Sequence, residues 1–137
     1  MPTKQIITPP NAPAPIGPYS PAVRWGDLVF TAGQIGLDPA DRKLVAGGIE
    51  AETRQALTNL QNVLTAAGSS LENVLKTTVF LRDITDFAAF NAAYGEFFAS
   101  DGDSSVANFP ARTTVEAGAL PAGAAVEIEA IAFVIEN

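Results

Sequence analysis

The chain has 137 residues, 47% of them hydrophobic, which is typical of a single domain with a packed core, here residues 1–137. Its formal net charge is −7 and its cations are scattered, which argues against a nucleic-acid partner and against an anionic membrane surface. It has no cysteine and no histidine, so disulfides, thiolate catalysis, a serine–histidine triad and the commonest metal ligand are excluded. We therefore expect no metal site.

The N-terminal half predicts a loop, a hairpin and a helix. Residues 1–15 hold no apolar run long enough for a signal peptide or a membrane span, so a cytoplasmic location is expected. The proline-rich residues 9–21 predict an extended loop. Residues 22–35 predict a β-hairpin that turns at Gly26-Asp27, with its second strand over 28–34. The 3.6-residue apolar period of residues 49–67 predicts a helix that ends at Gly68.

The C-terminal half predicts a strand, a helix and two further strands. Residues 75–82 alternate, which places Leu75 on one face with residues 77, 79 and 81. Asp86 can cap a helix over 87–98 that carries an aromatic stripe. A polar loop over 99–108 and strands over 113–117 and 125–135 follow.

The predicted order of elements is strand, hairpin, helix, strand, helix, strand, strand. Because both helices lie between strands, we expect an α+β fold with a single mixed β-sheet and two helices on one face. The other face of that sheet then needs a cover. Another copy of the chain would supply it.

Two charged residues are the main candidates for chemistry. Glu127 shares one face of the last strand with Glu129 and bulky apolar side chains, so it is either at a wet strand end or buried and paired. Arg112 stands before a β-branched run, either as a surface ion pair or as a planar fork for a carboxylate ligand. The two residues lie on successive strands. If these two strands are antiparallel neighbours in the sheet, Arg112 and Glu127 come together or lie around one pocket.

The other candidates each have a plain structural alternative. Tyr19 lies in the proline-rich loop, where it either packs on the core as a lid or donates a hydrogen bond to a ligand. Asn91 is typical of a helix-capping or inter-element hydrogen bond. The segment TAGQIG lacks the G-K-[ST] of a phosphate loop.

Several segments together resemble the RidA/YjgF family. IGPYSPAV, TAGQIGLDP, PARTTVE and ALPAGAAVEIEAIA occur in the order and spacing of that family, and the likeness covers residues 10–134. The resemblance implies a chorismate-mutase-like fold and a homotrimer with inward-facing sheets and three clefts between subunits. It also implies hydrolysis of reactive 2-imino and 2-enamino acids, such as 2-aminoacrylate and 2-iminobutanoate, to 2-keto acids and ammonia without a cofactor.

The resemblance also implies roles for individual residues. Arg112 matches the family's carboxylate-binding arginine, and Glu127 matches the glutamate that positions or activates water. Tyr19 matches a tyrosine that lines the cleft, Asn91 matches a polar residue near it, and the backbone around Gly33 is similar to the segment that contacts the ligand. Thr114, two residues after Arg112, is a further candidate for substrate binding.

Two positions depart from the family pattern. Ala32 stands where members of the RidA type often carry a serine, and Thr31 points to the opposite face of a strand. Thr114 stands where a cysteine is common, and it keeps a polar atom. The loss of the serine hydroxyl leaves the identity of the substrate open.

The sequence is also compatible with two alternative functions, and it argues against a third. Ala32 motivates a non-catalytic trimer that binds or senses small carboxylates. A second is a deaminase of a larger catabolic intermediate of the aminomuconate type. Ribonuclease activity is disfavoured because the chain is acidic and lacks an imidazole base.

Overall fold

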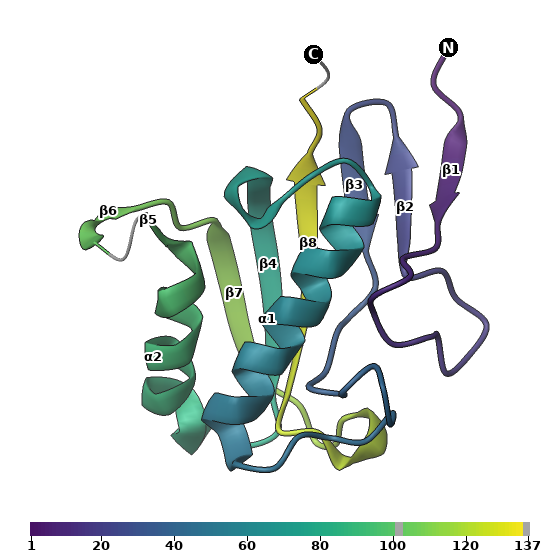
Figure 1. Cartoon of the computed structure of the whole chain (residues 1–137). Coiled ribbons are helices and arrows are strands. Elements are labelled where there is room, and N and C mark those ends of the chain that lie inside the picture. The colour runs from purple at the N-terminus through teal and green to yellow at the C-terminus, as the bar shows by residue number, and fades with distance from the viewer. Residues whose placement is uncertain (101–102, 136–137) are drawn as a thin grey trace.

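The computed structural model describes residues 1–100 and 103–135, which form one large sheet with two helices (Figure 1). The large sheet has six strands in the order β1-β2-β3-β8-β4-β7, and β5 and β6 pair separately. Only β4 and β7 run parallel; the other neighbours are antiparallel. The bounds are β1 Lys4–Ile7, β2 Ala22–Trp25, β3 Leu28–Thr31, α1 Gly48–Ala66, β4 Val74–Leu81, α2 Phe87–Phe98, β5 Ala99–Ser100, β6 Asp103–Ala107, β7 Ala111–Glu116 and β8 Val126–Phe133.

Helix α1 confirms the sequence prediction to within one residue at each end. Its apolar stripe is buried against the sheet, with Leu57, Leu60 and Leu64 fully inaccessible. Gly68 takes the left-handed conformation at φ 84°, and the Ser69 N–H returns to the Leu64 carbonyl at 2.8 Å. This closing turn satisfies carbonyl groups that the helix end would otherwise leave unpaired.

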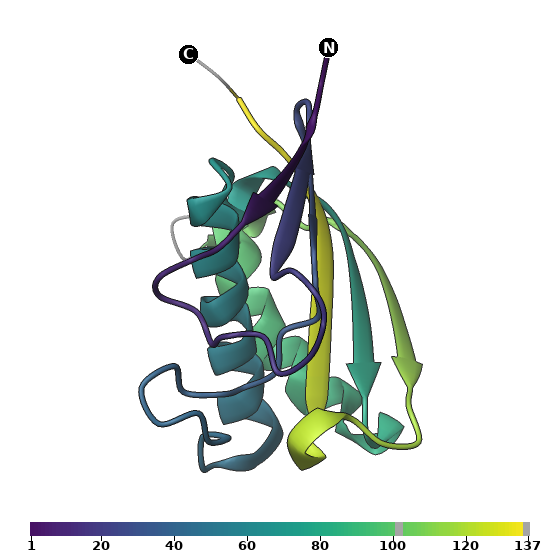
Figure 2. The ribbon, with the colours of Figure 1, turned by 90° about the vertical axis from the view of Figure 1, so that its right-hand side faces the viewer.

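The two helices cover one face of the sheet, as predicted, and Figure 2 shows the other face without a covering layer. Leu28, Phe30 and Val115 lie on that open face and are 38%, 44% and 41% exposed. These exposed apolar side chains stand on a sheet whose opposite face is a packed core. Neither described helix is both long enough and apolar enough to cross a bilayer.

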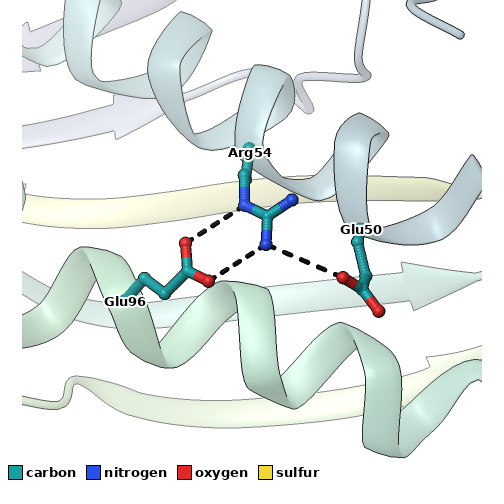
Figure 3. A network of polar contacts seen from close by, with 3 residues as sticks. All are labelled: Glu50, Arg54 and Glu96. Atoms are coloured by element: carbon teal, nitrogen blue, oxygen red, sulfur yellow. Dashed lines mark hydrogen bonds and ion pairs between the residues drawn. The ribbon is translucent and has the colours of Figure 1, made fainter. Parts of the chain in front are cut away.

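The helices are joined at the surface by an ion-pair cluster (Figure 3). Arg54 of α1 binds Glu96 of α2 through two hydrogen bonds of 3.1 and 3.0 Å, and Glu50 approaches Arg54 at 3.7 Å. The hydrogen bonds from Arg54 lower the pKa of the Glu96 carboxyl. The groups are well exposed, so the cluster adds little to stability and mainly fixes the neighbouring helix faces.

Four details of the predicted elements are wrong. The hairpin turn at Gly26 is present, but β3 ends at Thr31 because the chain leaves the ladder there. Leu75 is 48% exposed, because an irregularity between β4 positions 74 and 76 turns it away from the core. Asp86 precedes α2 without a side-chain capping bond; Asp83 instead accepts the Thr85 N–H at 2.9 Å. Strands β5 and β6 occupy most of the predicted loop 99–108, of which residues 101–102 lie outside the described residues.

Candidate functional site

The structure separates Arg112 from Glu127, which corrects the prediction that antiparallel neighbours bring them together. Strand β4 lies between β7 and β8. Arg112 is in register with Thr77 on the face that the helices cover. Glu127 is in register with Phe80 and alternates with the buried Ile128, so it lies on the open face. One chain therefore carries two separate groups of candidate residues.

Arg112 is stacked on an aromatic platform supplied by α2. Its guanidinium carbon lies 5.5, 5.3 and 4.9 Å from the ring centroids of Phe87, Phe90 and Tyr94, within the range of cation–π attraction. It makes no hydrogen bond or ion pair with any residue of the described chain, so the first of its two alternatives, a surface ion pair, is not formed there. The pocket around it has a volume of about 410 Å³ and is lined by Asn91, Tyr94, Gly95, Phe109, Pro110 and Arg112.

Two further candidates have unpaired polar atoms near this platform. Asn91 Oδ1 and Thr114 Oγ1 are buried and have no hydrogen-bond partner among the described residues. Asn91 borders the Arg112 pocket, and Thr114 lies two residues beyond Arg112 on the same face of β7. The capping or inter-element bond expected of the Asn91 oxygen is not formed. Since buried polar atoms normally find partners, these atoms are available to a ligand or to water.

The platform is itself anchored to the strand beside Arg112. The Tyr94 and Thr77 hydroxyls lie 2.7 Å apart in the core, and Thr77 is the register partner of Arg112. Burial raises the pKa of the Tyr94 hydroxyl, so the ring stays neutral beneath the guanidinium. Tyr94 thus links α2, β4 and β7 around the arginine.

Replacement of Tyr94 by phenylalanine removes this anchor and keeps the ring. We expect the free energy of unfolding to fall by about 1 kcal/mol, because the Thr77 hydroxyl is left buried without a partner. Urea titration of Tyr94→Phe and of the Tyr94→Phe/Thr77→Val double variant measures it. The double variant should regain part of the loss. An unchanged stability in Tyr94→Phe would contradict the structural role of this bond.

Glu127 points into a second pocket on the open side of the sheet. The cavity is about 230 Å³ in volume, and most of its wall is apolar. The polar side chains that reach it are Tyr19, Gln34 and Glu127. The apolar wall is formed by Pro13, Ala14, Pro15, Ile16, Pro21, Ala32, Gly33, Ile35, Leu37 and Pro121.

A bulge at residues 32 and 33 places Gly33 in close contact with the Glu127 side chain. The β3–β8 ladder runs to Phe30, the Thr31 hydroxyl then accepts the Ala130 N–H at 3.0 Å, and pairing resumes where Gln34 meets Ile128. Two residues therefore face one, which bends the strand. A Cβ at Gly33 would stand 2.7 Å from Glu127 Cγ and Cδ, so any larger residue here would force the Glu127 side chain to shift.

Ala32 borders the Glu127 pocket, whereas the Thr31 hydroxyl is committed to the backbone of β8. Thr31 therefore does not replace the hydroxyl that a serine at position 32 would supply.

Burial raises the pKa of the Glu127 carboxyl, and the nearby Glu129 carboxylate raises it further. Glu127 is half-buried in an apolar wall, whereas Glu129 is exposed two residues along the strand. A carboxylate placed in this way is a stronger base than a carboxylate in water. This supports the interpretation of Glu127 as a proton acceptor.

Tyr19 stands at the rim of the same pocket. It is 47% exposed, and its oxygen accepts the Ile16 N–H at 3.2 Å. The hydroxyl hydrogen has no acceptor among the described residues. Tyr19 is therefore not a lid on the core, and it retains a donor for a ligand.

Introducing a Cβ at Gly33 tests the contact with Glu127. We expect Gly33→Ala to lower turnover about 10-fold or more, because the methyl group displaces the carboxylate from its place. Gly118→Ala is the matched control, since a Cβ at Gly118 meets no atom within 4 Å. Steady-state kinetics of the two variants give the answer. Equal activity in both would contradict the functional meaning of this contact.

Sequence reasoning found both charged residues and missed the platform beneath Arg112. The aromatic stripe of residues 87–98 was evident in the sequence, but the stacking of Arg112 on it was not. The available signal was the strand–helix–strand unit β4-α2-β7, whose parallel strands require a crossover helix that packs over both. That unit places the inward side chains of the second strand under the helix.

The fold and the two pockets define a small α+β protein with Arg112 and Glu127 in separate pockets on opposite faces of one sheet. The chain belongs to the endoribonuclease L-PSP family, whose model matches residues 9–134. This confirms the predicted relationship to RidA/YjgF proteins.

Known proteins resemble the chain over nearly all of its length. A 2-iminobutanoate/2-iminopropanoate deaminase of Capra hircus is 48% identical over 129 residues, 94% of this chain and 89% of that protein. The crystal structure of the E. coli YjgF gene product has a TM-score of 0.85 at 41% identity, covering 94% of this chain and 98% of that one. That of E. coli TdcF with bound serine gives 0.86 at 37% identity, covering 96% and 99%.

Proposed function

We propose that the chain hydrolyses small 2-imino and 2-enamino acids to 2-keto acids and ammonia. The observation that carries this proposal is the pair of functional groups: an arginine fork with no hydrogen-bond or ion-pair partner among the described residues and a carboxylate with a raised pKa in an apolar pocket. The goat relative is named a deaminase of this kind, which supports the same conclusion.

Arg112 is proposed to hold the substrate carboxylate. A guanidinium offers two parallel N–H donors that match the two oxygens of a carboxylate. The aromatic platform orients the group and leaves its donors unoccupied. The amide of Asn91, the hydroxyl of Thr114 and the hydroxyl of Tyr19 supply further polar contacts around the substrate.

Glu127 is proposed to take a proton from the attacking water. A protonated imine is already electrophilic at C2, so water can add there without a protein nucleophile. Glu127 accepts one water proton as the C–O bond forms and returns a proton to nitrogen. The C–N bond then breaks, the oxygen passes its remaining proton to solvent water, and ammonia and the 2-keto acid leave. The backbone of Gly33, which lies against the Glu127 side chain, is proposed to contact the reacting group.

A complete site requires two copies of the chain, because Arg112 and Glu127 occupy different faces of one sheet. We propose a homotrimer whose open sheet faces pack inward, with each cleft combining the Arg112 pocket of one subunit and the Glu127 pocket of the next. The exposed apolar side chains Leu28, Phe30 and Val115 support burial of this face. The proposed partners are thus a small imino or keto acid and two further copies.

Mixed trimers test this arrangement directly. Arg112→Ala and Glu127→Gln should each be inactive, and trimers that contain both variants should regain activity because one cleft combines the two intact residues. Random mixing in equal amounts predicts roughly a quarter of wild-type activity. No recovery in trimers shown by mass spectrometry to be mixed would contradict a shared site.

A further inference from the structure

We propose that Asn59 and Glu52 of α1 are positioning residues that hold Gly33 and Glu127 in their working arrangement. The inference rests on the proposed function, because it assigns to buried residues outside both pockets a role in the same reaction. Asn59 and Glu52 are 0% and 7% exposed. They stand seven residues apart, so both lie on the inner face of the helix.

Asn59 holds the segment that follows Gly33. Its Nδ2 donates to the carbonyl oxygens of Ile35 at 3.0 Å and Leu37 at 2.8 Å. The orientation of the amide is fixed, because Asn59 Oδ1 accepts the Gln55 Nε2–H at 2.9 Å. Asn59 therefore uses both of its amide hydrogens on the segment 35–37. This segment begins two residues after Gly33, the residue that contacts Glu127.

Glu52 holds the start of the strand that carries Glu127. Its Oε1 accepts the Ala125 N–H at 2.9 Å, two residues before Glu127. The loop reaches the same point of α1, because a Cβ at Gly36 would lie 2.8 Å from Glu52 Cα. The two segments that form the Glu127 pocket thus converge on one turn of the helix.

The bridge between Gln34 and Ile128 transmits both restraints to the site. The Gln34 N–H donates to the Ile128 carbonyl at 2.8 Å, and the Ile128 N–H donates to the Gln34 carbonyl at 3.0 Å. Gly33 and Glu127 are the residues immediately before this pair. With the bridge closed and α1 holding the chain on both sides of it, the backbone positions of Gly33 and Glu127 are fixed relative to each other. Loss of either restraint frees the carboxylate to move away from the attacking water.

Steady-state kinetics with 2-iminobutanoate generated in situ test this inference in the full-length protein. Asn59→Asp keeps the shape of the side chain and replaces the donor that faces two carbonyls with an acceptor. We expect it to lower kcat about 10- to 100-fold, because small displacements of a catalytic group have effects of this size. KM should change less than about threefold, because in the proposed cleft the Arg112 that holds the substrate carboxylate belongs to the neighbouring subunit.

Glu52 offers a conservative pair of variants. Glu52→Gln keeps an acceptor for the Ala125 N–H and should retain kcat within about threefold, whereas Glu52→Ala should lose kcat as Asn59→Asp does. Gln55→Ala removes only the orienting contact and provides a milder test if Asn59→Asp does not fold. Gln61→Ala, at an exposed position of α1, is the control.

The outcomes separate this inference from the proposed function. Lower melting temperatures with wild-type kcat in the folded variants would overturn the positioning role and leave the deaminase proposal intact. Equal losses in Glu52→Gln and Glu52→Ala would also overturn it for Glu52. An inactive wild-type protein would overturn the proposed function, and the positioning role of Asn59 and Glu52 in that reaction with it.

Discussion

Arg112→Ala is expected to lower kcat/KM for 2-iminobutanoate by about 100-fold or more. Removing one member of a buried, hydrogen-bonded charge pair has effects of this size, because the other charge is left without its partner. The folded state should persist, since within the described chain Arg112 contributes stacking on α2 and no hydrogen bond. Kinetics and size-exclusion chromatography of the same preparation measure both properties.

Two further variants distinguish the effect of the paired N–H donors of Arg112 from the effect of its positive charge. Arg112→Lys keeps the charge and loses the paired donors, so it should recover only a small part of the activity. Arg42→Gln removes one positive charge from an exposed loop and should be close to wild type. An Arg112→Ala protein with wild-type kcat/KM would show that Arg112 does not hold the carboxylate.

Glu127→Gln is expected to lower kcat by roughly 100- to 10,000-fold, because the amide cannot accept a proton from water. KM should change little if the carboxylate of the substrate is held by Arg112. Glu129→Gln is the matched control: it lies two residues along the same face, it is exposed, and its loss leaves the base in place. Similar losses in both variants would contradict a specific role for Glu127.

Ionisation of Glu127 should have opposite effects on activity and stability. As pH rises through its pKa, kcat should increase and the free energy of unfolding should decrease. The base must be ionised, so the acid limb of kcat should lie above the ordinary glutamate pKa of 4.5. Stability changes with the opposite sign: a carboxyl whose pKa is raised by folding binds its proton more tightly in the folded state. Its contribution is therefore lost as pH rises through the folded pKa.

Glu127→Gln cannot ionise, so thermal melts should show it to be more stable than wild type at pH 7 and to differ less at pH 4. Glu129→Gln should shift the acid limb downward, because it removes the neighbouring negative charge. An acid limb that stays in place in Glu129→Gln would contradict the coupling of the two carboxyls.

The sequence was sufficient for the parts of the fold that local patterns control. The period of α1, the glycine after it and the alternation of β8 around Glu127 all predicted what the structure shows. The strand order was beyond those patterns, because insertion of β4 between β7 and β8 depends on long-range pairing. The same pairing places Arg112 and Glu127 on opposite faces.

The bulge before Gln34 was equally hidden. At the bulge the Ala130 N–H donates to the Thr31 hydroxyl, a contact between residues 99 positions apart. Sequence patterns therefore identified the candidate residues, whereas their division into two pockets required the structure. The assignment of their roles is what experiments must now test.

The most direct measurement follows the release of 2-ketobutyrate while threonine dehydratase generates the imine from threonine. We expect purified wild-type protein to accelerate release above the spontaneous rate, and we expect Arg112→Ala and Glu127→Gln not to do so. A spontaneous rate that the wild-type protein leaves unchanged, with 2-ketobutyrate still raising its melting temperature, would contradict catalysis and identify a carboxylate-binding protein instead.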